Sequence, residues 1–197
     1  MTPLPIVVLI SGEGTNLQAI IDAAAAGSLP IAVRAVISNR PAAKGLARAG
    51  RAGIPTEVVD HRRYADRAAF DAALQAVIDR YSPALVVLAG FMRVLGTPFV
   101  RRYRGRLVNI HPSLLPAFPG LDTHRRALAA GAAEHGASVH FVTEEVDGGP
   151  AIVRVRVPVL AGDDPRRLAD RVLTREHALY VAALRLLAQG RVQLKDG

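Results

Sequence analysis

A continuous apolar run at residues 6–10, Ile-Val-Val-Leu-Ile, constrains the fold more than any other segment of the chain. Such a run leaves no polar face, which is typical of a central strand in a parallel sheet that is covered on both sides. A glycine-rich turn follows, and then a helical apolar pattern over residues 17–26 that ends at Gly27. The segment therefore predicts a strand–loop–helix unit, the building block of an α/β protein.

The same alternation of apolar runs and amphipathic stretches continues along the chain. The predicted strands cover residues 31–38, 56–59, 84–88 and 107–110, and the predicted helices cover residues 42–52, 66–81 and 98–103. Longer strand patterns at 138–142 and 151–159 flank an Asp-Gly-Gly turn, where antiparallel pairing is expected. A capping Asp followed by Pro near residue 165 begins a long helix that ends near Gln189. We therefore predict a doubly wound, mostly parallel α/β sheet with helices on both faces and some antiparallel strands in the C-terminal half.

Length and composition favour one domain. A chain of 197 residues is long enough to bury a sizeable core. We expect a single domain over residues 1–197, with an N-terminal half of about 1–105 and a C-terminal half of about 106–197. The absence of cysteine excludes a disulfide framework, a thiol nucleophile and a cysteine-based zinc site. The lack of cysteine also favours a reducing cytoplasm as the location. Because no apolar segment approaches the roughly 20 residues of a membrane span, we expect no membrane partner.

The net charge of +8 favours anionic partners. The arginines stand as scattered singles and pairs, and they lack the interleaved aromatic side chains of a single-strand nucleic-acid binder. We therefore expect a solvated, arginine-rich surface that helps to attract small anionic substrates, and no nucleic-acid partner.

A glycine-rich segment, Ser11-Gly-Glu-Gly-Thr-Asn16, separates the first predicted strand from the first helix. Backbone N–H groups and the helix dipole make such a turn a ready anion site, although many such turns bind nothing. The segment lacks the third glycine of the dinucleotide fingerprint and the Gly-Lys-Ser/Thr of a P-loop. A phosphate group on a smaller ligand remains the functional interpretation.

The segments Asn109-Ile-His-Pro-Ser-Leu-Leu-Pro116 and Asp147-Gly-Gly-Pro150 combine an amide, an imidazole and a carboxylate. His111 and Asn109 share one strand face and can both donate to a developing oxyanion, while Asp147 can keep the imidazole cationic. Such a combination of donors and a carboxylate suits the catalysis of acyl transfer. The alternative is that these residues only cap turns.

The histidines show no metal-ligand spacing, so we expect no metal. His140 lies in an alternating strand pattern and is interpreted as structural. His124 follows near a helix start, where it lines the cleft or lies on the surface. Glu176 falls on an otherwise apolar helical stripe. Its carboxylate either points inward, where it needs a polar partner, or lies at the edge of the stripe beside an arginine.

Together with Phe91-Met-Arg-Val-Leu95, these motifs resemble the phosphoribosylglycinamide formyltransferase family, within the formyl-tetrahydrofolate transferases, over nearly all of the chain. The resemblance implies a Rossmann-like formyltransferase fold and a role in purine biosynthesis. It implies transfer of the formyl group of 10-formyl-tetrahydrofolate, as a cosubstrate, to the amine of glycinamide ribonucleotide. It also implies small-molecule partners only and a monomer or homodimer.

Carried over position by position, the resemblance assigns roles to matching residues. It implies a catalytic trio of Asn109, His111 and Asp147. The remaining implied residues are Gly14, Thr15, Asn16 and Glu176 on the ribonucleotide, and Arg67, Met92, Arg93, Val94, Leu95 and Asn109 on the folate. From the sequence pattern alone, residues 92–95 are instead the start of a helix packed on the core.

Small departures from the family pattern are Thr15 in place of a common serine, Glu13 beside the phosphate loop, and Asp122 in place of a histidine of some members. They bear on binding strength rather than chemistry. The alternatives are a related formyl-folate enzyme whose acceptor is methionyl-tRNA, an amino sugar or water, and a non-catalytic binding module. The methionyl-tRNA enzymes carry an additional C-terminal domain, which makes that acceptor the weaker expectation.

Overall fold

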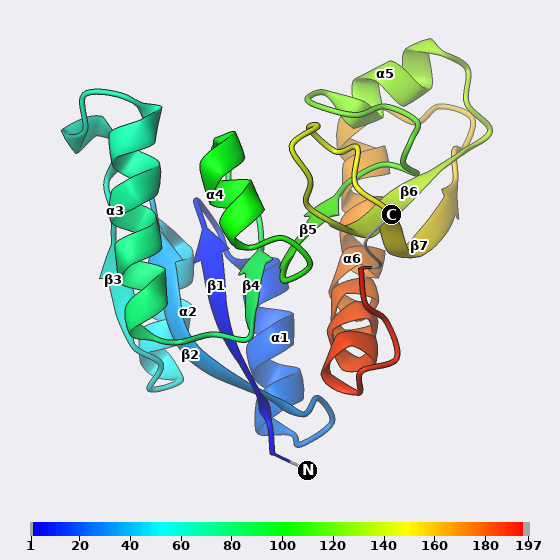
Figure 1. The fold of residues 1–197 in the computed structure, drawn as a ribbon. Coiled ribbons are helices and arrows are strands. Elements are labelled where there is room, and N and C mark those ends of the chain that lie inside the picture. Colours follow the sequence, from blue (N-terminus) through cyan, green and yellow to red (C-terminus); the bar gives the residue numbers. More distant parts are fainter. Residues whose placement is uncertain (1, 195–197) are drawn as a thin grey trace.

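The computed structural model describes residues 2–194, and within them seven strands form one sheet in the order β3-β2-β1-β4-β5-β6-β7 (Figure 1). The strands are β1 (Leu4–Ile10), β2 (Ile31–Ser38), β3 (Thr56–Val58), β4 (Leu85–Leu88), β5 (Leu107–His111), β6 (Glu134–Phe141) and β7 (Ala151–Pro158). The helices are α1 (Thr15–Ala25), α2 (Lys44–Arg51), α3 (Arg67–Arg80), α4 (Thr97–Arg102), α5 (Thr123–Ala129) and α6 (Pro165–Ala188), with a short 3₁₀ turn at His61–Arg63. The predicted α/β alternation is confirmed.

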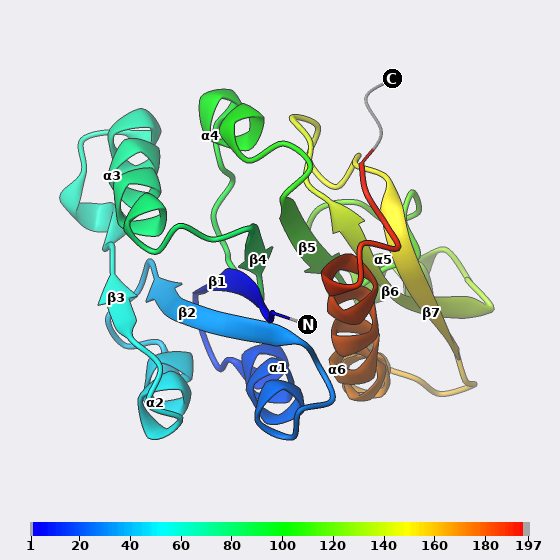
Figure 2. The same ribbon diagram turned by 60° about the horizontal axis from the view of Figure 1, so that its bottom comes forward.

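Helices cover both faces of the sheet, as Figure 2 shows, with α3 and α4 on one side and α1, α2 and α6 on the other. The side chains of β1 explain this arrangement. Ile6, Val8 and Ile10 enter the core beneath α1 and α6, whereas Val7 and Leu9 enter the core beneath α3 and α4. All five are completely buried, because successive side chains of a strand point to opposite faces. The uninterrupted apolar run is therefore a central strand, as predicted.

The strand order reverses at β1. From β1 the chain moves outward through β2 to β3, then returns to pair β4 with the other edge of β1 and continues to β5. All these pairings are parallel. The loops that follow β1 and β4 therefore diverge at the same sheet edge, the place where open α/β sheets bind ligands.

The last two strands pair antiparallel, which confirms the expectation for the C-terminal half. β6 pairs with β5, and β7 pairs with β6. In this register Asn109 lies directly opposite His140, and His111 lies opposite Ser138. The connection between β6 and β7 carries Asp147 back toward the end of β5.

The longest helix, α6, begins where the sequence pattern places it. The side chain of Asp164 accepts a hydrogen bond from the backbone N–H of Arg167, and Pro165 occupies the first turn. Near its other end, Tyr180 is fully buried, and its hydroxyl donates to the carbonyl oxygen of Leu88 at 2.8 Å. Within residues 2–194, no helix combines the length and the apolar character that crossing a bilayer requires.

Two boundaries differ from the sequence prediction. Residues 92–95 form a loop and not the start of a helix, and α4 begins at Thr97, one residue before the predicted start, because Pro98 suits the first turn of a helix and not its interior. Strand β6 begins at Glu134, four residues before the predicted start, because it extends along β7 as far as Pro158. The first residue of β6 is therefore set by its pairing with β7, and it cannot be predicted from the sequence pattern of β6 alone.

Replacing Tyr180 with Phe is expected to lower the free energy of unfolding by about 1 kcal/mol, because it removes one buried hydrogen bond while keeping the ring. Urea unfolding followed by circular dichroism measures the change. Tyr64→Phe is the matched control, since the Tyr64 hydroxyl makes no hydrogen bond to any of residues 2–194. Equal stability of the two variants would contradict a stabilising role for the Tyr180 hydroxyl.

Candidate active site

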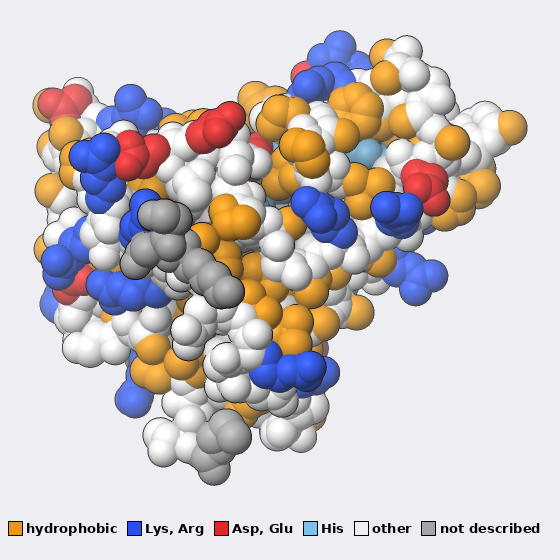
Figure 3. All heavy atoms as spheres, turned by 45° about the vertical axis from the view of Figure 1, so that its right-hand side comes forward, with side chains coloured by type: hydrophobic (Ala, Val, Ile, Leu, Met, Phe, Trp, Pro, Cys, Tyr) orange, Lys and Arg blue, Asp and Glu red, His pale blue; other side chains and the backbone are white. Residues whose placement is uncertain are grey.

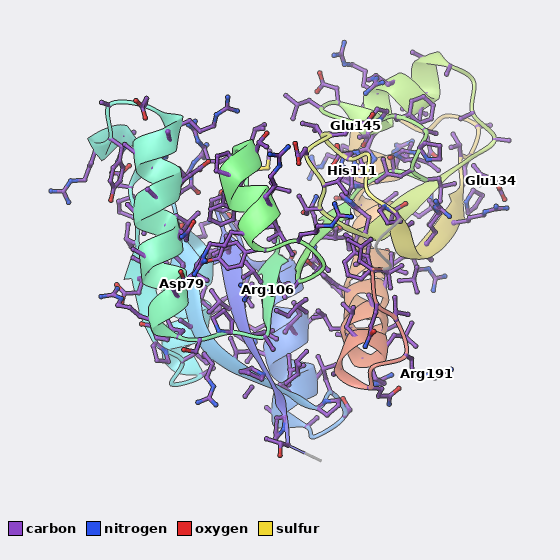
Figure 4. All side chains as sticks on the ribbon, in the orientation of Figure 1. Asp79, Arg106, His111, Glu134, Glu145 and Arg191 are labelled. Carbon is purple, nitrogen blue, oxygen red and sulfur yellow. The ribbon has the colours of Figure 1, made fainter. Side chains whose placement is uncertain are left out.

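Four polar side chains meet where β5 ends. Asn109 and His111 come from β5, His140 from β6, and Asp147 from the β6–β7 connection. One Asp147 carboxylate oxygen, Oδ2, lies 3.4 Å from Nδ1 of His111, and the other, Oδ1, lies 3.6 Å from Nε2 of His140. The Asn109 amide nitrogen lies 3.4 Å from Nε2 of His140. Figure 4 shows His111 beside the connection that carries Glu145. The structure thus brings the three residues of the predicted trio into one cluster.

The backbone of the Asp147-Gly-Gly segment fixes the carboxylate. Asp147 adopts a left-handed conformation with φ of 55°, which a short polar side chain tolerates better than most. Its Oδ2 also accepts a hydrogen bond of 2.8 Å from the backbone N–H of Gly120. A Cβ atom on Gly149 would lie 1.8 Å from the carbonyl oxygen of Phe141, so only glycine fits there. Gly149 is therefore required by close packing against the backbone and not only by a turn.

His111 is 7% exposed and has a hydrogen-bond acceptor on each side. Its Nε2–H donates to the carbonyl oxygen of Phe118 at 3.0 Å, and Nδ1 faces the Asp147 carboxylate. The doubly protonated imidazolium satisfies both neighbours, because both ring nitrogens then donate. The arrangement therefore suits His111 as a cationic donor of a proton or hydrogen bond.

The interpretation of His140 as purely structural needs revision, because its ring holds Asn109. His140 is 1% exposed, and burial lowers its pKa, which favours the neutral ring. Its Nδ1–H donates to the carbonyl oxygen of Phe141 at 2.9 Å, so Nε2 is left as an acceptor for the Asn109 amide. One N–H of Asn109 is thereby occupied, and the second remains available for a ligand.

The phosphate loop leads directly into helix α1. Gly14 adopts a left-handed conformation with φ of 72° and precedes the first helical residue, Thr15. A Cβ atom on Gly14 would lie 2.7 Å from the Cα of Gly45, so the loop rests on the backbone of α2. Glu13 points outward and pairs with exposed Lys44 at 2.8 Å. The negative charge of Glu13, a departure from the family pattern beside the phosphate loop, is therefore paired at the surface.

An open pocket lies beside the N-terminal end of α1. Its lining contains two residues that the sequence reasoning missed, Arg48 from α2 and His177 from α6, beside Thr15. Arg48 Nε donates to the carbonyl oxygen of Glu13 at 2.8 Å, and Nε2 of His177 is buried without a hydrogen-bond partner among residues 2–194. A cation and an unpaired imidazole nitrogen beside a helix N-terminus suit a bound anion at the Thr15 end of the pocket, whereas the Asp22 carboxylate lines it two helical turns further along α1.

Glu176 points inward and meets the phosphate loop. It is 8% exposed, and its Oε2 accepts a hydrogen bond of 2.8 Å from the Asn16 amide. Burial raises the pKa of Glu176. The Asn16 amide oxygen is buried with no hydrogen-bond partner in the described part of the chain. These two residues thus form a polar pair that a ligand hydroxyl can complete.

The residues expected on the folate lie on the loop after β4 and at the start of α3. Met92 and Val94 are 61% and 55% exposed, so two apolar side chains of this loop lie at the surface close to each other. The Arg93 guanidinium lies 5.9 Å from the centre of the Phe70 ring, and Arg67 is the first residue of α3. Figure 3 shows hydrophobic side chains and histidine close together on the upper part of the molecule.

The remaining histidines of the C-terminal half do not join the cluster. His124 and His135 pack edge to face with ring centres 5.1 Å apart, and burial lowers the pKa of His135 to about 4. His124 therefore packs against a buried ring and is not a free surface residue. Among the described residues 2–194, no group of three or more acidic or histidine side chains has the arrangement of a metal site.

Comparison with known proteins gives one consistent result. The family model described as formyl transferase matches residues 4–184. The phosphoribosylglycinamide formyltransferase of Escherichia coli (strain K12) is 53% identical over 191 residues, which cover 97% of this chain and 90% of that protein. The solved structure of glycinamide ribonucleotide transformylase 1 from Symbiobacterium toebii has a TM-score of 0.95 at 48% identity, and covers 100% of this chain and 92% of its own.

A second solved structure, the phosphoribosylglycinamide formyltransferase of Coxiella burnetii, has a TM-score of 0.93 at 53% identity, and covers 98% of this chain and 91% of its own. Both neighbours share the mostly parallel sheet with antiparallel strands at one side. These likenesses extend over the strands and loops that build the cluster of Asn109, His111 and Asp147. The chain therefore belongs to the formyl transferase family, among the phosphoribosylglycinamide formyltransferases.

Proposed function

We propose that this protein transfers the formyl group of 10-formyl-tetrahydrofolate to the amine of glycinamide ribonucleotide, a step of purine biosynthesis. The observation that carries the proposal is the buried contact between His111 and Asp147, 3.4 Å apart and beside Asn109. This cluster adjoins the sheet edge that holds a phosphate loop and a loop with exposed apolar side chains. Relatives named for this reaction match nearly the whole chain.

The ribonucleotide binds across α1 and α6 in this proposal. Its phosphate lies on the backbone of Gly14, Thr15 and Asn16, where the helix dipole and free N–H groups favour an anion. The Arg48 guanidinium lies in the same pocket and adds positive charge. The ribose hydroxyls donate hydrogen bonds to the buried Glu176 carboxylate. These hydrogen bonds offset part of the free-energy cost of removing that carboxylate from water.

The folate binds along the loop of residues 92–95. Its flat ring packs on the exposed apolar side chains of Met92 and Val94, and the loop backbone, including that of Leu95, offers hydrogen bonds to the ring edge. Arg67 and Arg93 lie where they attract the carboxylates of the folate tail. The exposed apolar surface of this loop supports the placement, because such surface is otherwise unfavourable in water.

The chemical step is amine attack on the formyl carbon. As the C–N bond forms, negative charge develops on the formyl oxygen, and His111 and the second N–H of Asn109 donate hydrogen bonds to it. The formyl oxygen competes with the Phe118 carbonyl for the His111 proton at Nε2. Asp147 stabilises the imidazolium and accepts, through water, the proton that the attacking nitrogen loses. When the tetrahedral intermediate collapses, the bond between the formyl carbon and N10 of the folate breaks, and the proton that the amine released is passed back through water to N10, so atoms and charges balance.

These steps use proton donors and acceptors of the chain together with water, so the proposed reaction includes no metal and no ATP. We also propose that the two halves form one domain, since one sheet runs through both, and that the enzyme acts in the cytoplasm as a monomer or homodimer. Its partners are then the two small substrates, without nucleic acid or membrane.

The first test is optical measurement of folate deformylation by the purified protein, with and without glycinamide ribonucleotide. We expect turnover only when the ribonucleotide is present. Turnover without any acceptor would instead indicate a hydrolase, and turnover with methionyl-tRNA or an amino sugar alone would indicate another acceptor. Binding of both ligands without turnover would contradict an enzymatic role.

Replacing His111 with Ala is expected to lower kcat by roughly two to four powers of ten, the usual span for a positioned acid or base. Steady-state kinetics with both substrates saturating measures the loss. His61→Ala serves as a comparison, because His61 lies outside the cluster on the 3₁₀ turn and is expected to retain far more activity. Near-full turnover by the His111 variant would exclude the proposed chemistry.

Replacing His140 with Leu is expected to lower kcat about tenfold, because the Asn109 amide loses the neutral acceptor that orients it. The KM of the ribonucleotide should change little, since His140 lies away from the phosphate loop. His140→Gln, whose side-chain oxygen can accept the same hydrogen bond, should recover part of the loss. Unchanged kcat in the Leu variant would show that Asn109 needs no such partner.

A further inference from the structure

Three loops of the sheet edge meet at one buried hydroxyl, that of Ser11. Ser11 directly follows β1 and is 3% exposed. Its backbone N–H donates to the carbonyl oxygen of Gly90 at 3.1 Å. Its Oγ accepts a hydrogen bond of 2.7 Å from the backbone N–H of Met92 and donates to Oδ1 of Asn39 at 2.5 Å. One side chain therefore joins the loops that follow β1, β2 and β4.

The Asn39 side chain determines which hydrogen bond the Ser11 hydroxyl donates and which it accepts. Asn39 follows β2 and is 1% exposed, and its backbone oxygen lies 3.0 Å from Nδ1 of His61. An amide oxygen only accepts hydrogen bonds, so the single Ser11 hydroxyl proton must point to Oδ1 of Asn39. The hydroxyl oxygen is then left to accept from Met92. Because the pair is shielded from water, these hydrogen bonds hold their geometry more strongly than exposed ones.

The two loops joined by Ser11 are those of the two proposed substrates. On one side, Ser11 leads into Gly12 and the phosphate loop that ends at Asn16. On the other side, Met92 begins the exposed part of the folate loop. The far end of the folate loop has its own anchor, because the backbone N–H of Gly96 donates to Oδ2 of buried Asp71 at 2.7 Å. Asp71 is attached only to the folate loop, whereas Ser11 is attached to both loops.

We propose that Ser11 is a positioning residue that sets the separation of the ribonucleotide loop and the folate loop. This inference rests on the proposed function, because it assigns one substrate to each loop. The amine and the formyl carbon belong to different ligands, so the spacing of the two loops determines how closely the two atoms approach. A displacement of about 1 Å can cost a factor of about one hundred in rate. A shared hydrogen bond limits such a displacement.

Ser11→Ala tests the proposal. The substitution leaves the Met92 N–H and the Asn39 amide oxygen without their partner in a buried place. We expect the kcat/KM of each substrate to fall about tenfold, the usual consequence of a lost buried hydrogen bond. We also expect kcat itself to fall, because the loops lose their alignment when both ligands are bound. Steady-state kinetics with each substrate varied in turn measures these parameters.

Two control variants separate alignment from general damage. Asp71→Ala removes the anchor of the folate loop alone, so it should raise the KM of the folate and leave that of the ribonucleotide nearly unchanged. Ser38→Ala removes a fully buried hydroxyl that bonds only within its own turn, to the backbone of Arg40, and should change neither constant. Thermal unfolding of all three variants reports the loss of stability separately.

A second measurement does not depend on turnover. Hydrogen–deuterium exchange of the wild-type protein with glycinamide ribonucleotide alone should show slower exchange in residues 90–96, which the ribonucleotide does not touch. The effect should be lost in Ser11→Ala, or in Ser11→Cys if the alanine variant does not fold. Slower exchange that persists in the variant, or a kinetic change confined to one substrate, overturns the proposal. A wild-type protein that binds the ribonucleotide but never transfers the formyl group instead overturns the proposed function.

Discussion

The antiparallel pairing of β6 with β5 is the constraint on which the site depends. Up to β5 the sheet is parallel, and parallel strands present only their carboxyl ends at the ligand edge. When β6 turns back along β5, His140 comes to lie opposite Asn109, and the connection to β7 returns Asp147 to His111. A cluster drawn from two strands and one loop results. Without this reversal, the motif residues at positions 109 and 111 would lack both the carboxylate and the neutral imidazole beside them.

Much of this organisation was predictable from the sequence, because its signals are local. The apolar run at residues 6–10 indicated a central strand, and Asp164 with Pro165 indicated the start of α6. The apolar stripe of α6 singled out Glu176 but left open whether its side chain lay inside or at the edge of the stripe, and the structure shows that it is buried. The trio of residues 109, 111 and 147 was predictable from residue chemistry together with the family resemblance, and the structure brings the three together.

Other features depend on contacts between distant segments, which a single sequence does not encode visibly. The pairing of Asn109 with His140 requires the strand register, so His140 resembled an ordinary core histidine. Arg48 reaches the phosphate loop from α2, and no local pattern distinguishes it from Arg51, the other arginine of that helix. The loop at residues 92–95 could not be predicted either, because its apolar residues are compatible both with the start of a helix and with an exposed loop. In each case the position of the residues is determined by contacts with neighbouring strands and loops.

The buried pair of Glu176 and Asn16 has a consequence for the ligand-free protein. The Glu176 carboxylate is withdrawn from water, and the Asn16 amide oxygen has no partner among the described residues, so burying this pair costs free energy when the chain folds. A ligand whose hydroxyl groups donate to these atoms relieves that free energy as it binds. If the ribonucleotide binds here as proposed, its binding and the folding of the protein are thermodynamically linked at this position, because the bound ligand stabilises the folded state.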